Sequence, residues 1–358
     1  MKNVIQGSLI TTFRCNAQCN MCNIWKFQTH PNEEIDASYY ENLPAGLRIN
    51  ITGGEPTLRK DIDRIFEILY PKSRLLELST NGYNTEKIVE LANKYPNILI
   101  RVSVEGLPKV NDTKRGIKDG FDHALRTMLE LKKTKCKNIG FSVVISPDNY
   151  MDLLHLYDLC VALDVELGNS AVHNSWYFHK EDNQIESEKA LEQHEKFVKA
   201  LLTSKRRHLK DRLKDYGRAY FNRSIHRRLR GDTDEYRPPC GALSDFFFID
   251  PWGNVTPATA AVKSGNWATS RKIPSRTSSP ATRPRKRWKR CATASATAPS
   301  SLPSATTWCA VPGCPSCGCS RTSGASARAK TCAGSETIIS IVTIVSIVTI
   351  ANVNQEKK

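Results

Sequence analysis

The chain has 358 residues and a formal net charge of +16, most of which lies in one part of the sequence. Residues 259–358 hold 15 Lys and Arg against two acidic residues, whereas the first 258 residues hold 37 basic and 34 acidic ones. The longer part therefore has the charge balance of an ordinary globular protein and is not a polycation. A chain of this length can bury a large core, so we expect one barrel-sized domain with an appendage.

The sequence contains no segment that would carry the chain into or across a membrane. Residues 1–13 lack the cleavage site of a signal peptide, and the apolar run at 338–350 has 13 residues where a spanning helix needs about 20. Twelve cysteines without a secretory signal favour metal ligation or redox chemistry over disulfides. We therefore expect a cytoplasmic protein with no membrane partner.

Short β-branched runs alternate with helical patterns through the first half of the chain. We predict strands at 9–13, 47–52, 74–79, 98–104, 138–146 and 165–172, each followed by a helical segment. The helix after the second strand shows its period in Ile62, Ile65, Phe66 and Leu69. Six βα units predict an α/β fold with a parallel sheet, either doubly wound or a partial (β/α)6 TIM-like barrel. In both, ligands bind at the C-terminal ends of the strands.

The rest of the chain has a different character. Residues 176–235 are mostly helical and highly charged, and their mixed charges favour a solvated surface over a nucleic-acid-binding face. Residues 246–249, the turn 250–254 and Val255 predict a hairpin. After Pro257 the sequence turns to Ala, Thr, Ser, Pro and Arg and cannot build an ordinary core.

The loop after the first strand carries Cys15, Cys19 and Cys22 in the pattern CxxxCxxC. Three thiolates can hold a 4Fe-4S cluster and leave one iron without a protein ligand, so that a small molecule can bind there. The same residues could form a zinc site that lacks its fourth ligand, or they could be three unrelated thiols. Polar motifs also end the next three predicted strands, namely TGGEP, STNG and SVEG.

The cysteine loop and the segment Gly53, Gly54, Glu55 and Pro56 together resemble the radical S-adenosylmethionine (SAM) superfamily, over residues 8–172. The resemblance implies the partial barrel, a 4Fe-4S cluster whose open iron is chelated by the amino and carboxylate groups of SAM, and a Gly53–Pro56 segment that receives the amino group. Glycines suit a place where backbone must approach a ligand closely. By itself, TGGEP also fits a plain strand-to-helix turn.

The resemblance also implies further SAM contacts. Thr80 and Asn81, and Ser103 and Glu105, stand where family members place polar groups near the ribose and the methionine carboxylate, although either pair also fits strand-end turns. Met21 stands where the family commonly has an aromatic residue against the adenine, and its polarizable thioether can cover a ring face. We expect the remaining cysteines of this half, Cys136 and Cys160, to be buried as small hydrophobes.

A small auxiliary unit is predicted to begin before Cys240. Cys240 and Gly253 match the opening of a SPASM or twitch auxiliary-cluster domain, which would have cysteine at position 258, where this chain has Ala258. Shifting the reading frame by one base at codon 257 allows a cysteine there and a Gly-Asn-Leu stretch after it. We therefore hypothesise a one-base deletion or sequencing error near that codon. In frame, Cys309, Cys314, Cys317 and Cys319 could instead form a metal site of their own.

These observations predict a radical SAM barrel with a helical extension at 1–235, the start of a SPASM or twitch-like unit at 236–258, and an irregular basic tail at 259–358. The resemblance implies an enzyme that cleaves SAM and abstracts a hydrogen atom from a peptide or a small metabolite. It also implies an electron donor such as flavodoxin or ferredoxin, and a second Fe-S cluster if the C-terminal frame is restored, with Cys240 as a ligand. A non-catalytic iron-sulfur protein or a nucleic-acid-binding protein is the alternative.

Overall fold

The computed structural model describes residues 5–175, 177–183, 188–230 and 245–256. The described residues fall into two units, one that ends in the 177–183 segment and also holds 245–256, and one that holds 188–230. Cys240, codon 257 and the tail after it lie outside the described residues. So do the four tail cysteines considered above as a metal site.

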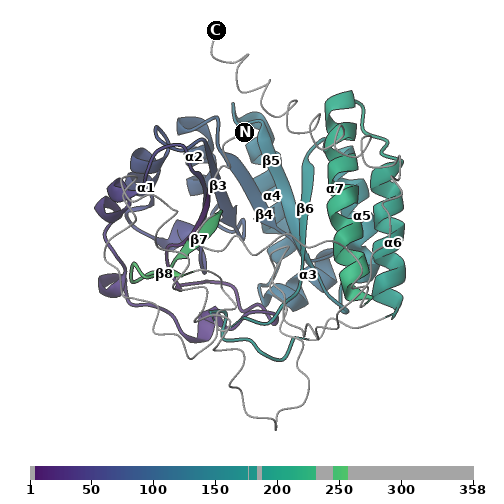
Figure 1. The fold of residues 1–358 in the computed structure, drawn as a ribbon, viewed down its shortest axis with the longest axis horizontal. Helices are drawn as coiled ribbons and strands as arrows, with labels where there is room; N and C mark the ends of the chain where they lie inside the picture. Colours follow the sequence, from purple (N-terminus) through teal and green to yellow (C-terminus); the bar gives the residue numbers. More distant parts are fainter. Residues whose placement is uncertain (1–4, 176, 184–187, 231–244, 257–358) are drawn as a thin grey trace, which may run out of the picture. The chain divides into compact units, whose positions relative to one another are not determined.

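A single mixed sheet organises the first unit (Figure 1). Its first six strands are parallel and lie side by side in chain order, which confirms the predicted α/β partial barrel. They are β1 Gln6–Ile10, β2 Arg48–Thr52, β3 Leu75–Thr80, β4 Leu99–Ser103, β5 Asn138–Ile145 and β6 Glu166–Ala171. The edge strands of the described sheet are β6 and β8 Val255–Thr256, so the barrel stays open.

Helices connect the strands from β2 onward, as the alternating periodicity predicts. They are α1 Ile62–Leu69, α2 Thr85–Lys94, α3 Pro108–Arg115, α4 Gly120–Lys133 and α5 Leu153–Ala162, while β1 and β2 are joined by short 3₁₀ turns. Ile62, Ile65, Phe66 and Leu69 are all buried, as their spacing predicts. Cys136 and Cys160 are also fully buried, as expected.

The first strand lies three residues earlier than the predicted 9–13. Thr11 makes one more bond, from its backbone N to the oxygen of Thr52 (2.8 Å), and the Thr12 hydroxyl then accepts the backbone N–H of Arg14 (2.9 Å). A local side-chain bond of this kind competes with the strand ladder and ends it. The buried residues 11–13 therefore lead into the cysteine loop as irregular chain.

The predicted hairpin joins the main sheet. β7 Phe246–Ile249 pairs antiparallel with β8, and on its other side it pairs parallel with β1. Gly7 permits this pairing, because a Cβ there would stand 2.7 Å from the Phe247 ring. The described part of the predicted auxiliary unit thus extends the barrel sheet at its β1 edge.

The second unit contains α6 Glu188–Leu202 and α7 Leu209–Leu229, which pack against each other. Ala190, His194, Phe197 and Leu201 form the buried face of α6. Residues 177–183 of the predicted helical region are instead extended and turn-like chain, with a bridge between Ser175 and Lys180. Among the described helices, none combines the length and the apolar character that crossing a bilayer requires.

Candidate radical SAM site

The cysteine loop leaves the C-terminal end of β1 and carries three unpaired thiols. Cys15, Cys19 and Cys22 are free and partly buried. The backbone N–H of Ala17 donates to the Cys15 sulfur (3.4 Å), and the indole N–H of Trp25 donates to the carbonyl oxygens of Cys19 (3.3 Å) and Cys22 (3.0 Å). The loop is thus held by local hydrogen bonds, and its sulfurs are available for ligation.

Two glycines let the end of β2 lie directly against this loop. The backbone N–H of Gly54 donates to Thr12 O (2.7 Å), and that of Glu55 donates to Arg14 O (2.8 Å). A Cβ on Gly53 would overlap the carbonyl oxygen of Thr12, and one on Gly54 would overlap that of Arg14. The absence of side chains here is therefore required by the cysteine loop itself.

Glu55 ties the end of β2 to the end of β3. Its buried carboxylate accepts the backbone N–H and the hydroxyl of Thr57 (3.1 and 2.7 Å), the hydroxyl of Thr80 (2.9 Å) and the backbone N–H of Asn81 (2.7 Å). The Asn81 amide in turn donates to the side-chain oxygen of Asn16 in the cysteine loop (2.6 Å). The predicted residues Glu55, Thr80 and Asn81 thus form one network that reaches the cysteine loop at Asn16.

Burial makes the metal-free thiols weak acids. It raises the pKa of Cys15 to about 12 and that of Cys22 to about 11, and it also raises the pKa of Cys19. The guanidinium of Arg115 opposes this shift at all three thiols. Such thiols stay protonated at neutral pH and lose their protons when a metal binds.

Three free thiols on one loop fit a 4Fe-4S cluster, because a cubane takes each thiolate on a different iron. A zinc site would instead need its ligands gathered around one centre. That Cys15, Cys19 and Cys22 hold a cluster stays a prediction.

Part of the chain matches a known protein family. Residues 9–160, which contain the cysteine loop and strands β2 to β5, match the model of the Radical SAM superfamily. Residues 9–160 are therefore a radical SAM domain, and this domain makes up less than half of the chain.

Curated relatives of the radical SAM domain have varied activities. Fe-coproporphyrin III synthase of Methanosarcina barkeri is 29% identical over 157 residues, which are 41% of this chain and 39% of that protein. GTP 3',8-cyclase of Aliarcobacter butzleri is 29% identical over 160 residues, which are 42% of this chain and 49% of that protein. The sporulation killing factor maturation protein SkfB of Bacillus subtilis is 25% identical over 163 residues, which are 44% of this chain and 39% of that protein. The matches thus span half or less of each relative.

Two solved structures share the fold. SuiB of Streptococcus suis, bound to S-adenosylmethionine, has a TM-score of 0.52 at 16% identity and covers 72% of this chain and 60% of its own. The protein anSMEcpe, with bound AdoMet and a peptide, has a TM-score of 0.50 at 16% identity, with 72% and 75% covered. The partial barrel of the radical SAM domain is therefore a fold that also occurs in proteins with bound SAM.

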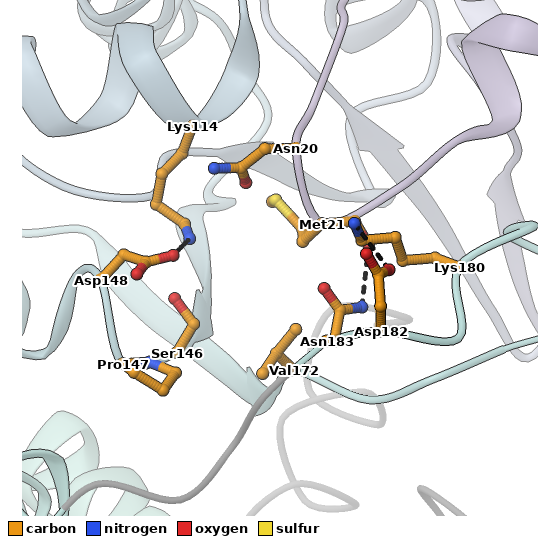
Figure 2. Close-up of a pocket in the computed structure, with 10 residues that line it drawn as sticks. All are labelled: Asn20, Met21, Lys114, Ser146, Pro147, Asp148, Val172, Lys180, Asp182 and Asn183. Atoms are coloured by element: carbon orange, nitrogen blue, oxygen red, sulfur yellow. Dashed lines mark hydrogen bonds and ion pairs between the residues drawn. The ribbon is translucent and has the colours of Figure 1, made fainter.

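A cavity of about 300 Å³ opens beside the cysteine loop (Figure 2). Met21, between two of the cysteines, lines it together with residues from α3, from the chain after β5 and from the chain after β6. Two ion pairs stand in its wall, Lys114 Nζ with Asp148 Oδ2 (3.1 Å) and Lys180 Nζ with Asp182 Oδ1 (2.8 Å). The cavity is thus polar, with balanced charges, and Met21 is the one residue among the predicted SAM contacts that lines it.

Asn183 has its carboxamide fixed at the edge of this cavity. Its Nδ2 donates to the carbonyl oxygens of Met21 (3.2 Å) and His173 (3.1 Å). Its side-chain oxygen then faces the cavity (Figure 2). The orientation of the amide follows from these two bonds.

The remaining two predicted residues lie at and just after the end of β4. Ser103 is its last residue and is partly buried. Glu105 is almost fully buried, and its carboxylate accepts from Arg115 Nη1 (3.0 Å) and from the backbone N–H of Val144 (2.8 Å). Burial raises the pKa of Glu105, with Arg115 opposing the shift. Contact of either residue with SAM stays a prediction.

Sequence reasoning missed the end of α3. The backbone oxygens of Lys114 and Arg115 accept the N–H groups of Asn20 and Gln18 (both 2.9 Å), and Gly116 follows in the left-handed conformation at φ +59°. A Cβ on Gly116 would stand 2.6 Å from the Gln18 oxygen. Gly116 after Lys114 and Arg115 is a sequence signal for the end of a helix. This signal does not indicate which residues the helix end contacts.

Proposed function

We propose that this chain is an enzyme that cleaves SAM reductively at a 4Fe-4S cluster held by Cys15, Cys19 and Cys22. The cluster and SAM supply, when bound, a 5′-deoxyadenosyl radical that takes a hydrogen atom from the substrate. The tasks of the protein are to bind, orient and enclose these groups. The observation that carries the proposal is the position of Met21, which stands between two cysteine ligands and lines the cavity.

We place the amino acid part of SAM at the Gly53–Pro56 segment. The amides of Gly54 and Glu55 are already bound by the cysteine loop. The segment therefore offers carbonyl oxygens, which are acceptors and suit an ammonium group. Glu55, Thr80 and Asn81 support this segment from behind through the network described above.

We place the adenine in the cavity of Met21 and Asn183. The Met21 thioether can lie on the face of the ring. The fixed side-chain oxygen of Asn183 is an acceptor and suits the amino group of adenine. About 300 Å³ lies at the lower end of small-molecule sites and fits a nucleoside.

The substrate that we propose is a polar small metabolite or a polar part of a peptide. By strand alternation, residues on the face of the sheet opposite the buried core include Asn50, Ser79, Arg101 and Glu166. Ser79 bonds Asn50 (3.0 Å), and Arg101 pairs with Glu166 (2.5 Å). An apolar substrate would find few partners on this face, whereas a hydrogen-bonding one would find many.

We further propose that the chain belongs to the SPASM or twitch-like subgroup and receives its electron from a donor such as flavodoxin or ferredoxin in the reducing cytoplasm. A complete auxiliary unit would hold a second cluster with Cys240 among its ligands. A shifted frame after codon 257 would remove that cluster, so we expect about four iron atoms per chain as the sequence stands. About eight would contradict the shifted frame, as would a nucleotide sequence that encodes Ala258 in frame in independent isolates.

Anaerobic reconstitution tests the function. The full chain with iron, sulfide, SAM and a strong reductant should release 5′-deoxyadenosine, and a variant with Cys15, Cys19 and Cys22 changed to Ala should not. The variant Cys136→Ala is a matched control, because that thiol is buried away from the loop on the chain before β5. Failure of the wild-type chain both to bind iron and to cleave SAM would overturn the proposal.

A further inference from the structure

Arg115 lies buried behind the part of the loop that carries Cys19. Its side chain is 11% exposed. Its carbonyl oxygen accepts the N–H of Gln18, and the oxygen of Lys114 accepts the N–H of Asn20, both at 2.9 Å. The end of α3 thus holds the two residues that flank Cys19, and the buried cationic side chain of Arg115 belongs to this same helix end.

The charge of Arg115 is fixed in place by Glu105. Arg115 Nη1 lies 3.0 Å from Glu105 Oε1, and the other oxygen of Glu105 accepts the backbone N–H of Val144 (2.8 Å). Neither side chain can swing away without leaving a buried polar group unpaired. Within the described residues the buried Arg115 Nε has no hydrogen-bond partner, so the carboxylate satisfies only part of the guanidinium.

A fixed buried cation beside a cluster affects how readily the cluster accepts an electron. Reduction adds one negative charge to the cluster, and a nearby positive charge stabilises the reduced form more than the oxidised form. The effect is strong where water does not screen it. Net charge and hydrogen bonding around the cluster are the protein's means of setting its potential.

We propose that Arg115 is a positioning residue that raises the reduction potential of the cluster, with Glu105 partly offsetting its charge. The inference rests on the proposed function, because it requires that Cys15, Cys19 and Cys22 hold the cluster. The pair serves electron entry, and through the loop contacts of α3 it also holds Cys19 in place.

The test is a redox titration, followed by electron paramagnetic resonance, of the reconstituted full chain without SAM. Arg115→Gln should shift the midpoint to a more negative potential, Arg115→Lys should stay near wild type, and Glu105→Gln should shift it to a more positive potential. Lys109→Gln is the matched control, since Lys109 lies on α3 and is exposed, and it should cause no shift.

The opposite signs separate an electrostatic role from a structural one. If the role of the pair were purely structural, both variants would lose the cluster, or the midpoint potentials of both would shift in the same direction. Either result would overturn the inference. If Arg115→Gln binds too little iron for titration, the sign for Glu105→Gln decides. As a second readout, SAM cleavage by Arg115→Gln should be weak with dithionite and recover with the stronger reductant titanium(III) citrate. A wild-type chain without any cluster would count against the proposed function instead.

Discussion

Gly54 lies so close to Arg14 that the two backbones leave no room for a side chain between them. A Cβ at position 54 would overlap the Arg14 carbonyl oxygen and stand 3.0 Å from the Cys15 Cβ. The end of β2 and the start of the cysteine loop are therefore one packed unit, and a change in one must move the other.

Gly54→Ala is expected to displace the cysteine loop, because the obstacle is backbone on both sides. The reconstituted variant should hold less than about half of the wild-type iron, as misplaced ligands weaken metal sites. Gly168→Ala is the control, since a Cβ in that strand would meet its nearest atoms only at 3.8 Å. Full iron content in Gly54→Ala would show that the loop can adapt.

Glu55→Gln should destabilise the fold by about 1–3 kcal/mol, because the amide NH₂ would face a donor where the carboxylate accepted one. Urea unfolding of the metal-free protein measures the loss. Glu41→Gln, which breaks an exposed pair with Arg64, should change stability by about 0.5 kcal/mol or less. Equal effects of the two substitutions would contradict the role given to the Glu55 network.

Glu34 should make the stability of the metal-free protein fall at acidic pH. Burial works to raise its pKa, but hydrogen bonds from Arg14, Thr12 and Thr29 outweigh burial and lower the pKa below the usual value. The contribution of Glu34 to the free energy of unfolding is therefore complete above the pKa of the unfolded state, about 4.3. It is lost as the pH falls through the lowered pKa of the folded state. The difference in unfolding free energy between wild type and Glu34→Gln should shrink in that window, and a difference that stays constant from pH 7 to pH 3 would contradict this.

His194 should make the α6–α7 unit weaker below neutral pH. Burial lowers the pKa of His194, whose Nε2 contacts Asn222 Oδ1 (2.9 Å) and whose buried Nδ1 has no hydrogen-bond partner among the described residues. The imidazole of His194 therefore binds a proton more readily in the unfolded state than in the folded state. The stability of the unit is complete above about pH 6.5, the pKa of the unfolded state, and falls below that pH. Amide hydrogen exchange in α6 and α7, corrected for intrinsic rates, should rise between pH 7.5 and 5.5 in wild type and stay level in His194→Gln.

Asn183→Ala should weaken SAM binding about tenfold, which is the loss of one hydrogen bond to an adenine amino group. Asn174→Ala is the matched control, because Asn174 holds the same segment through the Asn183 backbone N–H (2.8 Å) without lining the cavity. Equilibrium binding to the reconstituted protein measures both. Equal losses would mean that Asn183 only holds the segment in place.

The sequence alone determined the alternation of parallel strands and helices, and it predicts the residues of the metal loop. Periods of two and of 3.6 residues fix which segments become strands and helices, and these patterns are local, so they can be recognised without knowledge of the fold. The spacing of Cys15, Cys19 and Cys22 on one loop is local in the same way, and together with the Gly53–Pro56 segment it predicts an iron-sulfur site.

Only the tertiary structure decided what surrounds that loop. The pairing of β7 with β1, the contact of Gly116 with Gln18 and the bond from Asn183 to Met21 join residues far apart in the sequence. No local pattern encodes such contacts, because they depend on how closely packed backbones approach and on which buried polar groups find partners. The cysteines could therefore be named from the sequence, whereas Arg115, which lies buried behind them, could be found only in the fold.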